Sequence, residues 1–431
     1  MEAALIGFVV LMILLLLRLP LAIAMGLVGV LGFYSLTGNL DAAIMMGARR
    51  IVDGSMEYSL SVIPLFVLMG NFVAQAGLSA AIFRTTDGLM GHMKGGQAMA
   101  SVVASGAFSA ICGSSLATVA TMAKVSVPQM RAYGYSDRLS TASVAAGGTL
   151  GILIPPSVLL VIYGMLTETS IKGLFAAGML PGVIGILFYV LAVRWVVFRH
   201  PEEGPAGRKA SWGEFAHTLR DVWPTLILFV LVIGGIYGGV FTPTEAAAIG
   251  AMGAFIIALA ARSLSVKILI KILSDTARTT AMLFAIILTA MIFANFITRS
   301  GLPKDLLNIV TANGISPMMV LMIIMAIYIV LGCVLESMSM MLLTVPVFFP
   351  VMQGLGFDLI WFGILVVILI EVSLITPPVG MNVFVLRAVI PDVSTATVFK
   401  GILPFFTADV LRIILVILFP SVVMFLPDLL K

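Results

Sequence analysis

The sequence predicts an all-α polytopic membrane protein built as an inverted repeat, in which each half contains one re-entrant hairpin and one broken helix. Three observations carry this prediction. Of the 431 residues, 61% are hydrophobic and 10% are charged, whereas soluble domains carry about 25% charged residues. Two apolar stretches are each interrupted by a proline pair, Pro155-Pro156 and Pro377-Pro378. Several short motifs recur in the same order and at nearly the same spacing in both halves of the chain.

The proline pairs must interrupt the helices that contain them. Proline has no amide proton, its ring clashes with the carbonyl one turn back, and it disfavours helix at the preceding residue. The segments 140–165 and 361–387 therefore each contain a break. An unsatisfied carbonyl in hydrocarbon costs several kcal/mol, so a break requires a protein-lined or wet cavity, or a bound cation. Two breaks at corresponding positions of two halves indicate the binding site of a secondary transporter.

Hydrophobic stretches and their interruptions define the first half. The polar composition of 41–58 is typical of an amphipathic arm at the membrane interface. The stretch 97–128 is interrupted by Cys112-Gly113-Ser114-Ser115, which predicts a hairpin of two half-length helices; one long kinked helix is the alternative. The predicted elements are spans at 5–17, 19–36 and 59–77, the arm at 41–58, the hairpin at 97–128, the broken helix at 140–165 and a span at 171–198.

The second half follows a polar loop at 199–220 and has the same order of elements. Its hairpin has Glu336-Ser337-Met338-Ser339 in the middle of an apolar stretch. The predicted elements are spans at 222–241, 245–261 and 279–298, an arm at 264–278, the hairpin at 318–350, the broken helix at 361–387 and a final span at 402–426.

Short motifs align the two halves. The separation of Pro128 from Pro155 equals that of Pro350 from Pro377. Upstream, Gly70-Asn71-Phe72 resembles Ala294-Asn295-Phe296, and the hairpin tips align as well. Each half has an odd number of crossings, so the second half must be inverted relative to the first.

Basic residues predict the orientation of the chain. They gather at the mouth of the first hairpin, in the central loop and in the second arm. The positive-inside rule then places the first hairpin's mouth in the cytoplasm and the N-terminus outside. We divide the chain into scaffold spans and an arm at 1–93, a transport unit at 94–168, scaffold spans with the cytoplasmic loop 199–221 and the second arm at 169–315, a second transport unit at 316–390 and a C-terminal span at 391–431.

The tips and breaks together offer two cation sites. A hard monovalent cation prefers several neutral oxygens, which released carbonyls and hydroxyls supply. The alternative is that these small residues only let helices approach closely. The predicted first sodium site contains Ser109, Cys112, Ser114, Ser115, Gly151, Ile154 and Pro156, and the second contains Gly332, Ser337, Ser339, Ser373, Thr376 and Val379.

An anionic substrate is expected between the two tips, because half-helix N-termini carry partial positive charge. The residues expected near it are Asn71, Asn295, Glu336 and Asn382, and purely structural roles are the alternative. Two further acids lie in or beside apolar spans. Glu371 could tie the broken helix to a neighbour, and Glu245 could cap the helix that follows Thr242-Pro243-Thr244.

Other classes of function find no support in the sequence. We find no P-loop, dinucleotide fingerprint or zinc helix motif, and His92, His200 and His217 form no metal cluster. An enzyme is disfavoured because no nucleophile and base are brought together. The net charge of +4 comes from basic residues in loops, so it does not indicate nucleic-acid binding. Cys112 and Cys333 are far apart in apolar runs and are expected to be reduced.

Three motifs resemble one family. They are Phe241-Thr242-Pro243-Thr244-Glu245-Ala246-Ala247-Ala248, the segment 148–157 and the segment 374–380. They are similar to the signatures of the large membrane subunit of tripartite ATP-independent periplasmic (TRAP) transporters, the DctM-like group, and the resemblance covers nearly the whole chain. It implies a sodium-driven, elevator-type carrier in a bacterial inner membrane. It also implies two partners, a periplasmic substrate-binding protein (DctP-like) and a separate small four-helix membrane subunit (DctQ-like), and a carboxylate-bearing or other organic anion as solute.

The resemblance has two departures and leaves alternatives open. Cys112 stands where relatives often have Ser, and Glu336 where many have Asp, so a hydroxyl ligand at Cys112 is in doubt. A self-sufficient sodium/dicarboxylate symporter of related architecture is the second reading, and a scaffold or channel subunit is the third. The solute stays open among C4-dicarboxylates, sialic acid, other sugar acids and sulfonates.

Overall fold

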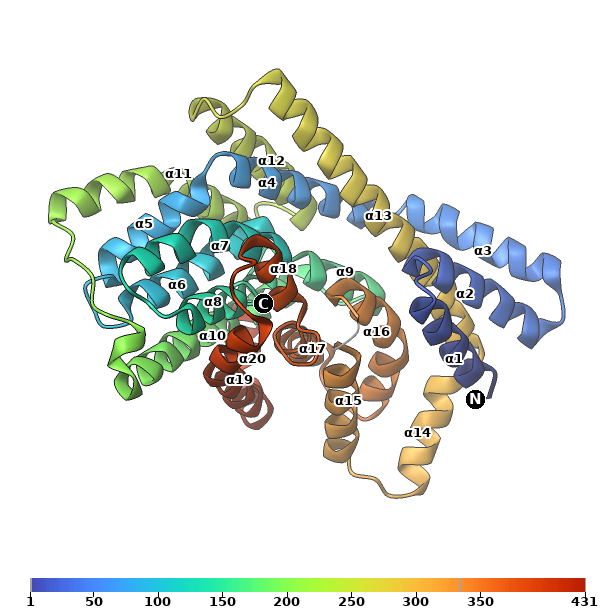
Figure 1. Cartoon of the computed structure of the whole chain (residues 1–431). Helices are drawn as coiled ribbons and strands as arrows, with labels where there is room; N and C mark the ends of the chain where they lie inside the picture. The colour runs from blue at the N-terminus through green and yellow to red at the C-terminus, as the bar shows by residue number, and fades with distance from the viewer. Residues whose placement is uncertain (1, 333–334, 431) are drawn as a thin grey trace.

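A computed structural model describes residues 2–332 and 335–430, and in this part of the chain the regular secondary structure is all helical, without strands (Figure 1). Seven of its helices are long and apolar enough to cross a membrane. The helices of the first half are α1 (Glu2–Leu16), α2 (Leu21–Thr37), α3 (Leu40–Ser55), α4 (Val62–Gln75), α5 (Leu78–Met90), α6 (Gly96–Cys112), α7 (Ser115–Ala132), α8 (Asp137–Gly147), α9 (Val158–Thr167) and α10 (Ile171–Arg199).

The second half has the same order of elements. Its last span ends in a short additional helix, α20. The helices are α11 (Trp212–Tyr237), α12 (Pro243–Ala260), α13 (Val266–Arg299), α14 (Leu302–Ala312), α15 (Pro317–Gly332), α16 (Ser337–Gly354), α17 (Leu359–Ser373), α18 (Met381–Val389), α19 (Thr395–Leu418) and α20 (Pro420–Leu429).

The two halves interlock rather than lie side by side. The second span of each half packs along a helix of the other half: α2 lies on α13, and α12 lies on α4 (Figure 1). The helices α4 and α13 contain the corresponding residues Asn71 and Asn295. Glycines permit the close approach, because a Cβ on Gly29 of α2 would meet Ile292, and one on Gly250 of α12 would meet Met69. The exchange of partners confirms the internal repeat.

Both predicted breaks and both hairpins are confirmed. The first break lies between α8 and α9 and contains a short 3-10 turn at Leu150–Ile152. The second lies between α17 and α18. The peptide bonds Pro155-Pro156 and Pro377-Pro378 are both cis. The first hairpin is α6 and α7, and the second is α15 and α16.

The structure differs from the predicted elements in two places. Two short amphipathic helices, α5 and α14, precede the hairpins and lie outside the predicted elements. The second arm and the following span form one continuous helix, α13, because its 34 residues contain neither Gly nor Pro. In the first half the arm and the span are separate: α3 ends at Ser55, and a 3-10 turn begins at Tyr58 before α4.

The hairpins and broken helices form one bundle with α10 and α19. The helix α8 packs against α6, α7 and α19, and α10 packs against α6, α17 and α19. At one end of this bundle Arg131 of α7 forms ion pairs with Asp137 (2.6 Å) and Asp392 (2.6 Å). How the chain divides into moving and fixed units stays a prediction.

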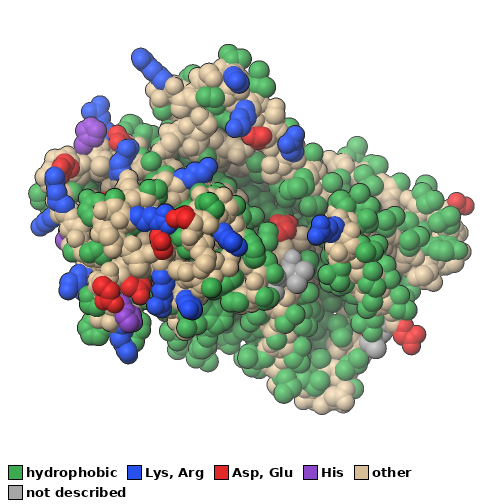
Figure 2. Space-filling model, viewed as in Figure 1, with side chains coloured by type: hydrophobic (Ala, Val, Ile, Leu, Met, Phe, Trp, Pro, Cys, Tyr) green, Lys and Arg blue, Asp and Glu red, His purple; other side chains and the backbone are tan. Residues whose placement is uncertain are grey.

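Charged side chains are unevenly distributed over the visible face of the molecule. Figure 2 shows Lys and Arg gathered at the left end, near the loop between α10 and α11, and at the top, near the start of α13, whereas the right half of this face is mainly hydrophobic. Large hydrophobic side chains such as Ile256 and Val230 are exposed on the long spans, as expected of a surface in contact with lipid.

Candidate functional site

Each hairpin touches the break of its own half through a serine and a glycine. A Cβ added to Gly151 of the first break would overlap Ser109 of α6. A Cβ added to Gly332, at the end of α15, would overlap Ser373 at the end of α17. The two residue types are therefore exchanged between the halves, and in both halves a hydroxyl lies where hairpin and break meet.

The breaks release backbone carbonyls, as predicted. Within the described part of the chain, no backbone N–H donates to the carbonyls of Ile154 and Pro156 in the first break, or of Thr376 and Val379 in the second. The helix after the first break, α9, is N-capped by Ser157, whose Oγ accepts from Leu160 N (3.2 Å). The first break is fully buried, whereas 376–379 of the second is half-buried or exposed.

The hydroxyls near the breaks donate to nearby carbonyls. Ser373 Oγ donates to Ile370 O (2.7 Å), Thr376 Oγ1 to Val372 O (2.7 Å), and Ser109 Oγ, at 3.4 Å, to Gly148 O. A hydroxyl that donates its proton keeps oxygen lone pairs for a cation. The donor set at each break therefore suits a hard cation that prefers neutral oxygens.

The two hairpin tips are capped differently. Ser114 caps α7 by accepting from Ala117 N (3.3 Å). Glu336 caps α16, because its Oε1 accepts from Ser339 N (3.2 Å) and Ser339 Oγ (3.0 Å). Ser337 is the first residue of α16. Cys112 is half-buried, with its thiol reduced. Cys333, next to Gly332, lies outside the described residues.

Asn382 joins three elements of the bundle. Its Oδ1 accepts from Ser115 Oγ (2.9 Å) of α7, and its Nδ2 donates to Ala145 O (3.0 Å) of α8. Because Asn382 is the second residue of α18 and is fully buried, it fixes the second broken helix against the first hairpin and the first broken helix. Its hydrogen bonds are all internal to the bundle.

Asn71 and Asn295 lie on the interlocked spans instead, and each contacts the arm of the other half. Asn71 Nδ2 donates to Thr276 Oγ1 (2.8 Å) at the arm end of α13. With its amide oxygen facing α3, Asn295 accepts from Arg50 Nη2 (2.7 Å) and Nε (3.1 Å). The structure thus separates the predicted substrate residues: Asn71 and Asn295 are on the spans, and Glu336 and Asn382 are in the bundle.

A cavity of about 740 Å³ lies between the spans and the bundle. Arg50 and Asn295 line it on one side, and residues of α9 and α16, including Gly164 and Pro350, line it on the other. Arg50 is the cation that the sequence analysis missed at this place. The only sequence feature that pointed to Arg50 was its place in the interfacial arm at 41–58. This feature is not specific, because basic residues are common in such arms.

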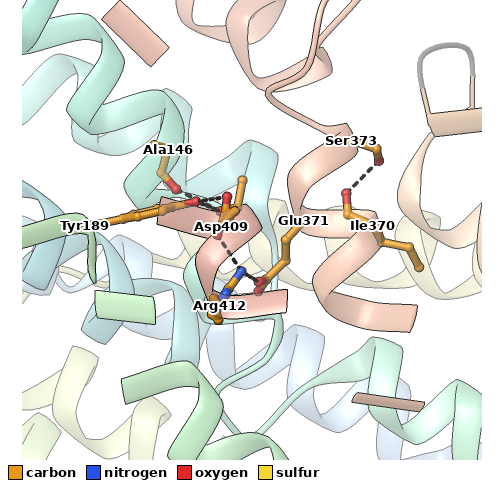
Figure 3. Close-up of polar contacts among 8 residues, drawn as sticks. Ala146, Tyr189, Ile370, Glu371, Ser373, Asp409 and Arg412 are labelled. Atoms are coloured by element: carbon orange, nitrogen blue, oxygen red, sulfur yellow. Dashed lines mark hydrogen bonds and ion pairs between the residues drawn. The ribbon is translucent and has the colours of Figure 1, made fainter. Parts of the chain in front are cut away.

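A buried polar cluster lies beside both breaks (Figure 3). Arg412 Nη2 of α19 donates to Glu371 Oε2 (2.7 Å) and pairs with Asp409 Oδ1 (2.8 Å). Tyr189 of α10 donates to Asp409 Oδ2 (2.5 Å) and lies 3.5 Å from Thr149 Oγ1. The contact of Glu371 with a neighbouring helix was expected, whereas Tyr189, Asp409 and Arg412 were missed. An Asp and an Arg three residues apart within an apolar span were the signal.

The second expected acid, Glu245, has the capping role that the sequence predicts. Its Oε2 accepts from Thr242 N (2.8 Å), and its own N–H donates to Thr242 Oγ1 (3.3 Å). This reciprocal pair is a capping box at the start of α12. Among the described residues, no group of His, Cys, Asp and Glu side chains could hold a transition metal.

Comparison with known proteins adds independent findings. A sequence model described as "Tripartite ATP-independent periplasmic transporter, DctM component" matches residues 8–422. The C4-dicarboxylate TRAP transporter large permease protein DctM of Pseudomonas aeruginosa is 36% identical over 88% of this chain and 89% of its own length. The sialic acid TRAP transporter large permease protein SiaM of Vibrio cholerae is 32% identical (93% and 92%). The ectoine TRAP transporter large permease protein TeaC of Halomonas elongata is also 32% identical (96% and 97%).

Solved structures show the same fold at low identity. The YdaH transporter of Alcanivorax borkumensis superposes with a TM-score of 0.63 at 15% identity, covering 89% of this chain and 90% of its own. The antimetabolite efflux pump MtrF of Neisseria gonorrhoeae superposes with a TM-score of 0.60 at 12% identity, covering 90% and 85%. The sequence match over almost the full length shows that the chain belongs to the DctM family, the large membrane component of tripartite ATP-independent periplasmic transporters.

Proposed function

We propose that this chain is the large transmembrane subunit of a sodium-coupled secondary transporter that imports a carboxylate-bearing or other organic anion. One observation carries the sodium part of the proposal. Among the described residues, each of the two breaks has carbonyls without backbone donors, and a serine–glycine contact places a hydroxyl between the same break and the hairpin of its half. Neutral oxygens in this arrangement are the ligands that a sodium ion prefers.

The two proposed sodium sites follow the repeat. In the first, Ser109 and the carbonyls of Ile154 and Pro156 are the central ligands. In the second, Ser373, Thr376 and the carbonyl of Val379 are central. The remaining proposed members lie at the hairpin tips and at the first break: Cys112, Ser114, Ser115 and Gly151 in the first site, and Gly332, Ser337 and Ser339 in the second.

The cavity beside Arg50 is the proposed route of the organic anion. Arg50 is half-buried and donates two hydrogen bonds to Asn295, so its guanidinium is held at the cavity wall. An anion in the cavity contacts Arg50 on the arm helix α3 and the hairpin of the second half through α16. The relatives named above carry C4-dicarboxylate, sialic acid and ectoine, and we propose a small organic acid for this chain as well.

An elevator mechanism is the proposed motion. The hairpins and broken helices share one bundle with α10 and α19, whereas α2, α4, α12 and α13 form an interlocked set that spans both halves. We propose that the bundle moves as a unit against the interlocked spans, and that sodium orders both hairpins before the anion completes the site. The proposed orientation has the N-terminus in the periplasm and the loop 199–221 in the cytoplasm of a bacterial inner membrane.

Two partners complete the proposed transporter. A periplasmic substrate-binding protein delivers the anion, and a small four-helix membrane subunit enlarges the fixed spans. The family assignment supports both, because the family is a component of a tripartite system.

Uptake by proteoliposomes tests the function. The large subunit, its small subunit and the loaded binding protein are reconstituted, and uptake of the labelled anion is followed with an inward gradient of sodium or of potassium. Saturable uptake that requires both sodium and the binding protein is expected. Uptake that is unchanged in potassium contradicts sodium coupling, and equal uptake without the binding protein favours the self-sufficient symporter. Ion conductance without saturable uptake favours a channel subunit.

A further inference from the structure

The buried cluster of Thr149, Tyr189, Asp409, Arg412 and Glu371 follows the internal repeat. Thr149 lies six residues before Pro155, and Glu371 lies six residues before Pro377. Their partners correspond too. Tyr189 lies eight residues after Pro181 of α10, and Arg412 lies eight residues after Pro404 of α19.

The cluster is therefore made of two equivalent pairs, joined by Asp409. In the first half the pair is neutral, Thr149 with Tyr189, and in the second it is charged, Glu371 with Arg412. Asp409 accepts from Tyr189 through one oxygen and pairs with Arg412 through the other. One continuous polar chain thus connects the segments that lead into the two breaks (Figure 3).

Burial of this cluster destabilises the fold, which suggests that the cluster has a functional role. Glu371, Asp409 and Arg412 are each 0% exposed, and the desolvation of buried charges costs several kcal/mol per ion. The helix α10 makes room for the cluster, because a Cβ on Gly185 would overlap the guanidinium of Arg412. Within the described residues, Glu371 Oε1 and Arg412 Nε have no hydrogen-bond partner. A well-packed apolar core would be cheaper at this place.

The charges of the cluster do not balance. Two carboxylates face one guanidinium, so with all three groups ionised the cluster carries a formal charge of −1. No other charged side chain is hydrogen-bonded or ion-paired to it among the described residues. The proposed sodium ligands lie close along the chain: Gly151 is two residues after Thr149, and Ser373 is two residues after Glu371. A negative charge near two cation sites favours the binding of a cation at both of them.

We propose that this cluster positions the two breaks relative to one another, which makes the binding of two sodium ions interdependent, and that it supplies a fixed counter-charge that favours both ions. The inference rests on the sodium sites proposed above. When sodium orders one break, it fixes the positions of the pair beside that break, either Thr149 with Tyr189 or Glu371 with Arg412. Because Asp409 contacts both pairs, the second pair and its break are then also restricted. Each residue of the cluster acts through the backbone at the break and touches no ion.

Sodium-dependent thermal stabilisation of the purified transporter tests the proposal. The large subunit with its small subunit is titrated with NaCl, and KCl keeps the ionic strength constant. We expect a steep response with a Hill coefficient above 1. Asp409→Asn removes the charge with little change in shape, and should raise the half-saturating sodium concentration about tenfold, the order expected for a unit charge acting across roughly 10 Å of protein.

A second variant separates the linkage from the charge. Tyr189→Phe removes one hydroxyl and keeps all three charges, so the Hill coefficient should fall towards 1 while the sodium requirement changes less than in Asp409→Asn. Glu202→Gln is the matched control, because Glu202 is an exposed acid of the central loop and its change should leave both quantities at their wild-type values.

The outcomes distinguish the inference from the proposed function. If the wild-type protein responds to sodium, and Asp409→Asn and Tyr189→Phe both show the same midpoint and steepness, the proposed role of the cluster is wrong. The proposed sodium sites are then unaffected. A wild-type protein without any sodium-specific response overturns the sodium sites, and this inference with them. If Asp409→Asn does not fold, Tyr189→Phe decides, and wild-type steepness in that variant overturns the proposal.

Discussion

Gly332 of the second hairpin lies directly against Ser373, and the first half contains the same contact with the residue types exchanged, Ser109 against Gly151. In each half one partner has no side chain, so the helices approach until a single hydroxyl fills the contact. The close approach places a hydroxyl at the contact between the hairpin and the segment that the proline pair interrupts. The same close contact of a serine with a glycine thus occurs once in each half, with one proposed sodium ligand at each contact.

Adding a methyl group at these contacts should stop transport. Gly151→Ala and Gly332→Ala force the hairpin away from the break, because the new Cβ overlaps the facing serine. Overpacking of this kind costs about 1–3 kcal/mol. We expect sodium-driven uptake in proteoliposomes to fall at least about tenfold, with a lower melting temperature. Gly234→Ala is the control, since nothing lies within 4 Å of its added Cβ; equal uptake in all three variants would contradict the prediction.

Thr376 should set the sodium requirement through its hydroxyl. Thr376→Ala removes one proposed ligand of the second site, and we expect the sodium concentration for half-maximal uptake to rise about tenfold while the maximal rate changes less. Thr289→Ala provides the comparison, because the hydroxyl of Thr289 also bonds to its own helix (2.8 Å to Ala285 O) but lies on α13. Unaltered sodium dependence in Thr376→Ala would remove this residue from the ligand set.

Arg50 should be needed for recognition of the anion. A hydrogen bond to a charged group contributes about 1.5–3 kcal/mol, so Arg50→Gln should raise the KM for uptake by about ten- to hundredfold. Arg49→Gln is the matched control, because the neighbouring side chain is 84% exposed and pairs with Asp53 (3.6 Å) on its own helix. Initial rates are measured over a range of anion concentrations, and equal KM values for the two variants would argue against a role for Arg50.

Asn382 should stabilise the bundle through Ser115. Asn382→Ala leaves Ser115 Oγ and Ala145 O without a partner in a buried site, which costs about 1–3 kcal/mol. A double-mutant cycle with Ser115→Ala measures the coupling by thermal unfolding in detergent. We expect a coupling energy of about 0.5–2 kcal/mol. Additive effects of the two single changes would show that the hydrogen bond contributes nothing to stability.

The sequence predicted the features that local chemistry decides. Proline pairs break helices wherever they occur, so the positions of both breaks follow from Pro155 and Pro377 alone. The hairpin tips are just as local, since small polar residues interrupt long apolar stretches. The capping role of Glu245 could be predicted because Thr242 precedes it by three residues.

Features that depend on packing could not be predicted in the same way. The helix α5 contains Arg84, Thr85 and Asp87, so its composition is not that of a span, and only its contacts with α6 and α11 show its place. The partners of Asn71 and Asn295 come from the arms of the opposite halves, which periodicity does not place. The contact between Tyr189 and Asp409 joins residues 220 positions apart in sequence.

The interlocking of α2 with α13 and of α4 with α12 constrains biogenesis. While the first half is being inserted, α2 and α4 lack their main partners, α13 and α12. The amide of Asn71 also lacks its hydrogen-bond acceptor, Thr276, which is synthesised 205 residues later. A chain severed in the central loop would therefore yield two fragments that mature only when they are produced together in the same membrane.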